Sequence, residues 1–157
     1  MTITNDGTLP DWPRTLRRYL IASLALHFGW EIVQLPLYTL WTTAPLREQA
    51  FAVAHCTAGD GMIAGLTLLL AMVIAADRDW PRTGHGRVWL LMLFLGAAYT
   101  IYSEWMNVTV RKSWAYAPLM QTLPPLGTGL SPLLQWIIVP TLAMGFATGR
   151  WPWGEQH

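Results

Sequence analysis

Four long segments with almost no charge constrain this chain more than any other feature of its sequence. Stretches such as LTLLLAMVIAA and VWLLMLFLGAA have no polar face, whereas every helix of a soluble bundle needs one. A bilayer crossing takes about 20 mostly apolar residues. We therefore predict an all-α fold, a multi-pass transmembrane four-helix bundle. It forms a single domain over residues 1–157, with spans at approximately 18–41, 50–76, 88–110 and 130–148.

The composition supports a membrane protein and excludes several other classes. Charged residues make up 12% of the chain and apolar residues 53%, so charge has about half its usual share. No Lys/Arg cluster is paired with aromatics, which argues against a nucleic-acid partner. The lone Cys56 excludes an internal disulfide and a multi-cysteine metal site. The partners we expect are the membrane and a lipid-like small molecule, and homo-oligomerisation stays open.

The distribution of Lys and Arg predicts the orientation. Seven arginines precede the first span, lie between spans two and three, or follow the fourth: Arg14, Arg17, Arg18, Arg78, Arg82, Arg87 and Arg150. The opposite side has three basic residues, Arg47, Arg111 and Lys112. Under the positive-inside rule this asymmetry places both termini in the cytoplasm. Because Arg outnumbers Lys nine to one, we expect a GC-rich bacterial source and hence a bacterial cytoplasmic membrane.

Two prolines and one long connection interrupt the apolar pattern. Pro36 is expected to kink the first span, and Pro140 lies inside the fourth. The connection over 113–129 is aromatic and rich in Pro and Gly, and is too apolar for an ordinary solvated loop. We expect it to lie in the membrane interface or to fold back over the bundle.

Five ionisable residues fall within the predicted spans, where hydrocarbon makes each of them costly. They are His27, Glu31, His55, Asp60 and Glu104. An ionisable group inside the membrane is a functional-site candidate by default. At about 1.5 Å rise per residue, Glu31 and Asp60 come out near the midplane. His55 and Glu104 then lie in the outer half of the bilayer, and His27 lies slightly to the cytoplasmic side of the midplane. Antiparallel neighbours can therefore gather these groups into one buried cluster.

Helical spacing supports this cluster in the first and third spans. His27 and Glu31 are four residues apart on one helix face, and Gln34 extends that face by a turn. In the third span a stripe of small and polar residues suits an interior face: Gly96, Thr100, Glu104 and Asn107.

The second span fits less well. His55 sits about 140° around the helix from Asp60, so both cannot point at one spot without a local distortion. The flanking Gly59 and Gly61 could permit such a distortion.

Three functions of different classes compete. The first is an intramembrane enzyme doing acid–base chemistry, isomerase- or cyclase-like, on a sterol-, terpenoid- or other lipid-like substrate, without a cofactor. Glu31 and Asp60 would share the catalytic proton transfers, with His27 tuning Glu31. The residues expected to bind the substrate or line its pocket are Trp30, Gln34, His55, Glu104, Asn107 and Trp136.

The two other functions belong to different classes. A haem or metal site could use His27 and His55, although the HxxxE pair alone is a weak metal signal. A proton-coupled transporter, a lipid-binding protein or a partner subunit of a membrane complex is the third alternative. The lack of an inverted repeat argues against a complete transporter.

The order of motifs resembles the emopamil-binding-protein (EXPERA) family. HFGWE in the first span, an acid early in the second, YSEWMN in the third and LLQWIIVP in the fourth follow the family's sequence over residues 18–148. The resemblance implies a four-to-five-helix membrane fold that includes sterol isomerases and sterol-binding relatives. It matches the family's His-x-x-x-Glu to His27 and Glu31, and its span-two Glu to Asp60.

The resemblance continues into the last two spans, with departures. The family's Thr-Glu falls near Ser103 and Glu104, and its Trp-x-x-x-Pro on Trp136 and Pro140. Where the family has Asn three residues before that Trp, this chain has Leu133. The missing amide puts a sterol double-bond shift in particular doubt, while a lipid-binding pocket open to the bilayer remains implied.

Overall fold

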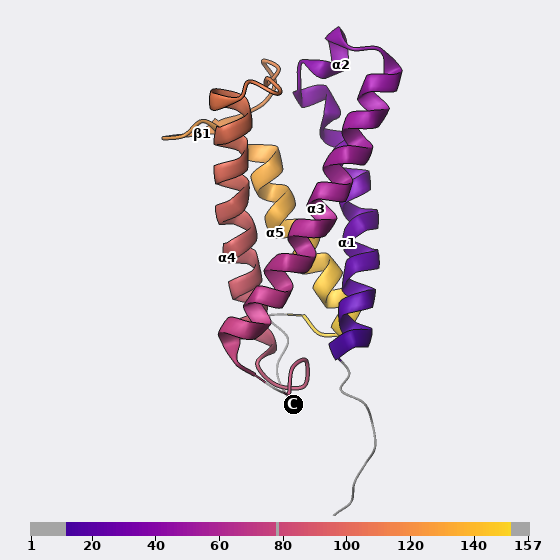
Figure 1. Ribbon diagram of the computed structural model, residues 1–157, viewed down its shortest axis with the longest axis vertical. Coiled ribbons are helices and arrows are strands. Elements are labelled where there is room, and N and C mark those ends of the chain that lie inside the picture. The colour runs from indigo at the N-terminus through magenta and orange to yellow at the C-terminus, as the bar shows by residue number, and fades with distance from the viewer. Residues whose placement is uncertain (1–11, 78, 152–157) are drawn as a thin grey trace, which may run out of the picture.

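The apolar segments form four long helices in the computed structural model, which describes residues 12–77 and 79–151 (Figure 1). Within this part of the chain the long helices are α1 (Trp12–Gln34), α3 (Leu46–Ala75), α4 (His85–Glu104) and α5 (Leu130–Thr148). The four candidate spans built on them are long and apolar enough to cross a membrane. The predicted all-α four-helix bundle is confirmed.

The helices run up and down in turn. Helices α1 and α4 each pack against α3 and α5, so the bundle closes in the order α1, α3, α4, α5 (Figure 1). One end carries the 76–84 connection and the chain following α5. The other end carries the short helix α2 (Leu40–Thr43) and the connection from α4 to α5 (Figure 1).

Helix α1 is polar on its buried face and apolar on its exposed face, as expected where lipid is the solvent. The buried residues of α1 are Thr15, Tyr19, Ser23, His27, Glu31 and Gln34, which recur every three or four positions. Large apolar side chains on the same helix are exposed, among them Ile21, Phe28 and Val33. Lipid accepts apolar side chains, so a helix of this kind turns its polar stripe toward its neighbours.

The first span differs from its predicted bounds of 18–41. It begins at Trp12 and ends at Leu37, because α1 stops at Gln34 and a short 3₁₀ turn, η1 (Leu35–Leu37), follows. Pro36 lies in that turn and ends the helix instead of kinking it, since proline lacks the N–H that would continue the ladder. The second and third spans begin a few residues earlier than predicted, at Leu46 and His85, and the fourth matches 130–148.

Helix α5 accommodates Pro140 without a break. Proline removes one backbone hydrogen bond within a helix, and lipid offers no substitute for it. The carbonyl of Trp136 is the one that loses its helical donor at Pro140, and the adjacent Thr141 hydroxyl donates to the next carbonyl along the chain, that of Ile137, at 2.6 Å.

The connection from α4 to α5 folds back over one end of the bundle, one of the two alternatives predicted for it. After α4 the chain passes through a π-helical stretch, η2 (Trp105–Val110). Thr39 then donates its backbone N–H to Ala115 and Ala117 donates to Leu37, which ties this connection to the chain after α1. A small antiparallel hairpin, β1 (Thr122–Leu123) with β2 (Thr128–Gly129), leads into α5.

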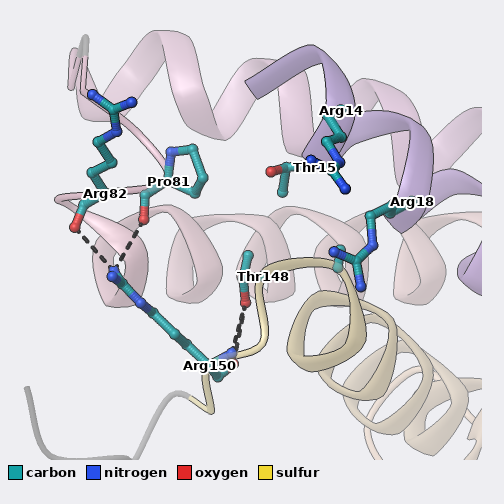
Figure 2. Close-up of a pocket in the computed structure, with 8 residues that line it drawn as sticks. Arg14, Thr15, Arg18, Pro81, Arg82, Thr148 and Arg150 are labelled. Atoms are coloured by element: carbon teal, nitrogen blue, oxygen red, sulfur yellow. Dashed lines mark hydrogen bonds between the residues drawn. The ribbon is translucent and has the colours of Figure 1, made fainter. Parts of the chain in front are cut away.

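At the opposite end of the bundle, two arginines connect helix ends to neighbouring segments. The Arg150 guanidinium donates to the carbonyls of Pro81 at 3.4 Å and Arg82 at 3.1 Å, which fastens the chain after α5 to the 76–84 connection (Figure 2). Arg18 of α1 donates to the carbonyl of Phe146 at 3.0 Å. Cations placed there also suit the negative end of the α5 dipole.

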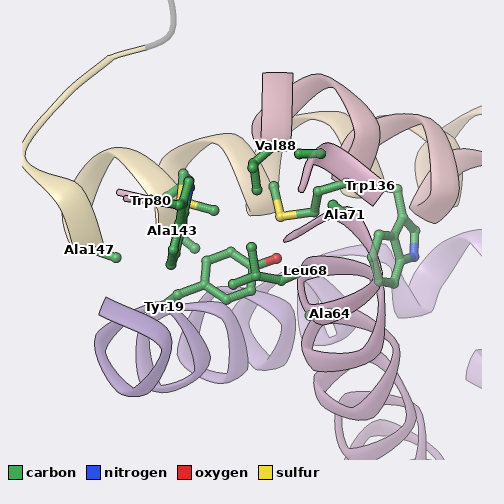
Figure 3. Packing of buried hydrophobic residues seen from close by; sticks show 12 residues of the cluster. Tyr19, Ala64, Leu68, Ala71, Trp80, Val88, Trp136, Ala143 and Ala147 are labelled. Carbon is green, nitrogen blue, oxygen red and sulfur yellow. The ribbon is translucent and has the colours of Figure 1, made fainter. Parts of the chain in front are cut away.

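The apolar core lies mainly in the half of the bundle next to the 76–84 connection and reaches as far as Trp136, and Figure 3 shows its packing. It is built from the start of α1 and α4 and from the later turns of α3 and α5, with Tyr19, Leu68, Val88 and Ala143 among its buried members. The other half holds the late turns of α1 and α4 and the early turns of α5, where the polar residues lie. We call the first the apolar half, although it also buries Thr15, Ser23 and Thr67, and the second the polar half.

Candidate functional site

A cavity of about 420 Å³ occupies the polar half of the bundle. This volume lies within the usual range for small-molecule sites. All four long helices line it, together with Leu40 of α2 and Ser113 and Trp114 of the connection that folds back over its end. The polar lining residues are Glu31, Gln34, Tyr38, His55, Cys56, Asp60, Tyr99, Thr100, Ser103, Glu104, Asn107, Arg111, Ser113, Trp114 and Gln135.

The side-chain amide of Gln135 joins three helices on one wall of this cavity. Its nitrogen lies 2.8 Å from Nδ1 of His27 and 3.0 Å from Oε1 of Glu31, both on α1. The same nitrogen lies 3.0 Å from Oδ2 of Asp60 on α3. Since Gln135 itself is on α5 and is 2% exposed, this contact fixes the carboxyls of two helices at one buried point.

The number of hydrogens at this point is smaller than the number of acceptors. An amide nitrogen carries two hydrogens, so three neighbouring acceptors cannot all receive a full hydrogen bond from it. His27 Nδ1 also lies 3.3 Å from Asp60 Oδ2. With the ring proton on Nε2, His27 accepts from Gln135; with the proton on Nδ1, His27 donates to Asp60. The network therefore has two arrangements that differ only in the placement of protons.

A second layer of hydrogen bonds holds the first in place. Gln34 donates to Glu31 at 2.8 Å and to the Gln135 oxygen at 3.2 Å, while its own oxygen accepts from Ser131 at 2.9 Å. The Trp30 indole N–H donates to the Ser131 hydroxyl at 3.2 Å. Together these bonds lock α1 against α5, so the carboxyl of Glu31 is presented in a fixed direction.

Glu104 occupies a different hydrogen-bonding site in the same cavity. Its carboxyl accepts the hydroxyl proton of Tyr116, and the Tyr116 oxygen in turn accepts from the backbone N–H of Gly129 at 2.9 Å. Burial raises the pKa of Tyr116 above its ordinary value, and the hydrogen bond to Glu104 raises it further. Tyr116 therefore stays a neutral donor and ties the folded-back connection to α4.

Most of the residues predicted for the site line this cavity. Seven of the nine do so: Glu31, Gln34, His55, Asp60, Glu104, Asn107 and Trp136. His27 is fully buried and stands behind the wall, in contact with Asp60 and Gln135, with its ring 5.2 Å from that of Trp136. Trp30 also stands outside the lining, in its bond to Ser131.

His55 lines the cavity but belongs to no cluster with Asp60. Its ring is exposed and stacks on Phe51, with the ring centres 5.7 Å apart. Helix α3 runs unbroken from Leu46 to Ala75, so the glycines around Asp60 introduce no distortion that would turn the two side chains together. The angular separation expected from helix geometry explains this placement.

The central donor, Gln135, was not identified from the sequence. It lies within LLQWIIVP, where the Trp and Pro drew attention and the amide between apolar residues did not. An uncharged polar group inside a span is itself a signal, because lipid leaves its hydrogen bonds unmet. Tyr116 and Ser131 carried no such signal, since both lie outside the apolar segments or at their edge.

A metal site has no support from side-chain grouping. Over residues 12–77 and 79–151, no group of three or more His, Cys, Asp or Glu residues is placed to hold a metal ion. Haem ligation by His27 and His55 stays a prediction.

Comparison of the chain with models of protein families, with curated proteins and with solved structures gave no match.

Proposed function

We propose that this membrane protein is an enzyme doing acid–base chemistry on a lipid-like substrate, an isomerase or cyclase, within the cavity of its polar half. The observation that carries the proposal is the Gln135 amide, which holds the carboxyls of Glu31 and Asp60 at the cavity wall. Two acids from different helices on one nitrogen are an expensive arrangement in a membrane, where a single amide or hydroxyl would serve as well to join helices.

The proposed chemistry follows from the charge that this wall can hold. Two carboxylates so close together cannot both be ionised out of water, so they share one proton between them. One carboxyl is then an acid and the other a base at the same time. His27 contacts Asp60 and the Gln135 amide, and a shift of its ring proton moves the balance between them.

The proton balance closes without a cofactor. The protonated carboxyl adds its proton to one carbon of a substrate double bond, and the carboxylate removes a proton from a neighbouring carbon, which shifts the double bond. In a cyclisation, a second double bond attacks the cation before that proton is lost. Trp136 lines the cavity, and an aromatic ring beside a cation stabilises it.

The lining also supports the substrate class. Beside the carboxyls the cavity is lined by apolar side chains that include Leu35, Val53 and Ile63. Glu104 ends α4, and Asn107 lies in η2, which follows it. Because α4 does not neighbour α1 in the ring of helices, these two residues can hold a polar group of the substrate away from Glu31. A mainly apolar molecule with one hydroxyl or epoxide, of sterol or terpenoid type, suits this distribution.

Orientation and location belong to the same proposal. The end with the 76–84 connection carries Arg14, Arg17, Arg18, Arg82, Arg87 and Arg150, whereas Arg78 lies outside the described residues. We place this end in the cytoplasm of a bacterial cell and the cavity in the outer half of its cytoplasmic membrane. The resemblance to the EXPERA family supports the same class of substrate.

The decisive experiment replaces each acid with its amide. Glu31→Gln and Asp60→Asn keep hydrogen bonding but remove proton exchange. Proteoliposomes would be incubated in D₂O with a panel of Δ8-sterols and polyprenols, and deuterium incorporation would be measured by mass spectrometry. We expect the unaltered protein to incorporate deuterium into one class and each variant to lose about a hundredfold in rate or more.

A control and a second readout separate catalysis from folding. Glu48→Gln changes an exposed acid in the first turn of α3 and should leave incorporation unchanged. Infrared difference spectra from mildly acidic to mildly alkaline pH should show a protonated-carboxyl band that disappears in the Glu31 or Asp60 variant. Lipid bound without any deuterium incorporation would reduce the function to lipid binding, and the absence of that band would remove the shared-proton mechanism.

A further inference from the structure

We propose that a second cavity, at the end of the bundle with the 76–84 connection, binds the phosphate of an anionic phospholipid headgroup. This cavity measures about 290 Å³, and four arginines line it, namely Arg14 and Arg18 of α1, Arg82 of the connection and Arg150 after α5 (Figure 2). Thr15 and Thr148 add hydroxyl groups to the same lining. The cavity lies at the opposite end of the bundle from the carboxyls, so the inference is independent of the proposed enzyme.

Two of the guanidinium groups are fixed in place by the backbone. Arg18 gives one N–H to the Phe146 carbonyl, and Arg150 uses Nη1 alone for the carbonyls of Pro81 and Arg82. A guanidinium has five N–H donors, so each retains several for a ligand. Preordered arginine forks suit phosphate oxygens, because they form paired, charge-assisted hydrogen bonds.

The lining carries positive charge from two separate parts of the chain. No carboxylate is among the residues of the described chain that line this cavity. Arg14 and Arg18 of α1 and Arg150 after α5 repel one another, and Arg150 is held there by backbone carbonyls. A bound anion would relieve this repulsion and bridge α1 and the end of α5.

The surroundings indicate a lipid rather than a soluble phosphate. The Arg18 guanidinium lies 5.1 Å over the Phe146 ring, and Phe146 and Ile21 are exposed on the outer faces of α5 and α1. An acyl chain could lie along these apolar faces while its phosphate reaches the arginines. Basic pockets between helix ends on the cytoplasmic side are where anionic headgroups bind.

The experiment measures lipid binding by native mass spectrometry of the detergent-purified protein. Phosphatidylglycerol, phosphatidylcholine and inorganic phosphate would be titrated separately. We expect phosphatidylglycerol to bind at least about tenfold more tightly than phosphatidylcholine, and Arg14→Gln to weaken it by about tenfold, as expected for a lost charge-assisted hydrogen bond. Arg14 is exposed in the first turn of α1, so this variant should fold normally, which a thermal melt would verify.

Arg87→Gln is the matched control. Arg87 is exposed, lies on the same side of the membrane and does not line the cavity, so its loss should weaken binding less than about threefold. Equal losses in Arg14→Gln and Arg87→Gln would reduce the effect to general surface charge and overturn the site. Inorganic phosphate binding as tightly as phosphatidylglycerol would overturn the lipid assignment.

Discussion

Replacement of Gln135 by methionine tests how the polar half of the bundle is held together. Methionine is unbranched and of similar size, so the packing of α5 is kept while the amide is lost. At most three hydrogen bonds disappear with it: two of the three contacts that its nitrogen makes with His27, Glu31 and Asp60, and the one that its oxygen receives from Gln34.

The expected cost follows from the number of bonds and from what remains. Interhelical hydrogen bonds in membranes contribute about 0.6 kcal/mol each on average, so three amount to about 1.8 kcal/mol. We do not expect a larger cost, because each carboxyl keeps another hydrogen-bonding partner. Glu31 keeps the Gln34 donor at 2.8 Å, and Asp60 keeps His27 at 3.3 Å. We therefore expect Gln135→Met to lower the free energy of unfolding by about 2 kcal/mol.

Reversible unfolding in mixed micelles of detergent and dodecyl sulfate, followed by helical ellipticity, would measure this change. Ile138→Met is the control, because Ile138 is exposed on the same helix, and its substitution should stay within about 0.5 kcal/mol. A loss below about 0.5 kcal/mol for Gln135→Met as well would refute the reasoning, since it would mean that the amide network adds nothing to helix association.

Three further predictions concern packing, ionisation and topology. Gly96→Ala should lower the free energy of unfolding by about 1–3 kcal/mol through overpacking, because a Cβ at Gly96 would run into the Trp136 ring. Gly86→Ala is the control, because a Cβ there meets no other atom, and it should be neutral or stabilising. Equal effects of the two substitutions in an unfolding titration would contradict this packing. Burial and the hydrogen bond to Glu104 raise the pKa of Tyr116, so Tyr116 contributes stability that is complete below the ordinary value of 10.0 and is lost as pH rises above it. Tyr116→Phe should lessen that loss and remove a late step from the tyrosinate absorbance titration, and an unchanged titration would contradict the raised pKa of Tyr116. Reporter fusions to both chain ends should give a cytoplasmic signal, and a fusion within the β1–β2 hairpin should give a signal from the opposite side of the membrane. Chain ends found on opposite sides would exclude four crossings.

The amino-acid sequence alone predicted the class of fold, because the solvent imposes it. In lipid, a long apolar segment must satisfy its own backbone hydrogen bonds, and an α-helix does so within the segment. This requirement can be read from the segment alone, without knowing which other segments pack against it. For the same reason the fourth span was predicted at 130–148 and found at Leu130–Thr148. The first span was displaced because apolar character does not show whether a proline bends a helix or ends it, and at Pro36 it ends the helix.

The arrangement of the site depended on contacts between helices. Spacing along single helices correctly predicted the buried face of α1 with His27, Glu31 and Gln34 and the interior stripe of α4 with Gly96 and Glu104. Spacing does not show which residue of another helix meets them, since this is set by the order and depth at which the helices pack.

Only the tertiary structure placed Gln135 between the two acids and Tyr116 on Glu104. Gln135 reaches Glu31 across about a hundred residues of chain, and Tyr116 reaches Glu104 through a connection that folds back over the bundle. Hydrogen bonds act over about 3 Å, and the chain is brought within that distance only after the helices have packed. The sequence thus determined which groups lipid would force inward, and the packing of the helices decided which of them share a proton donor.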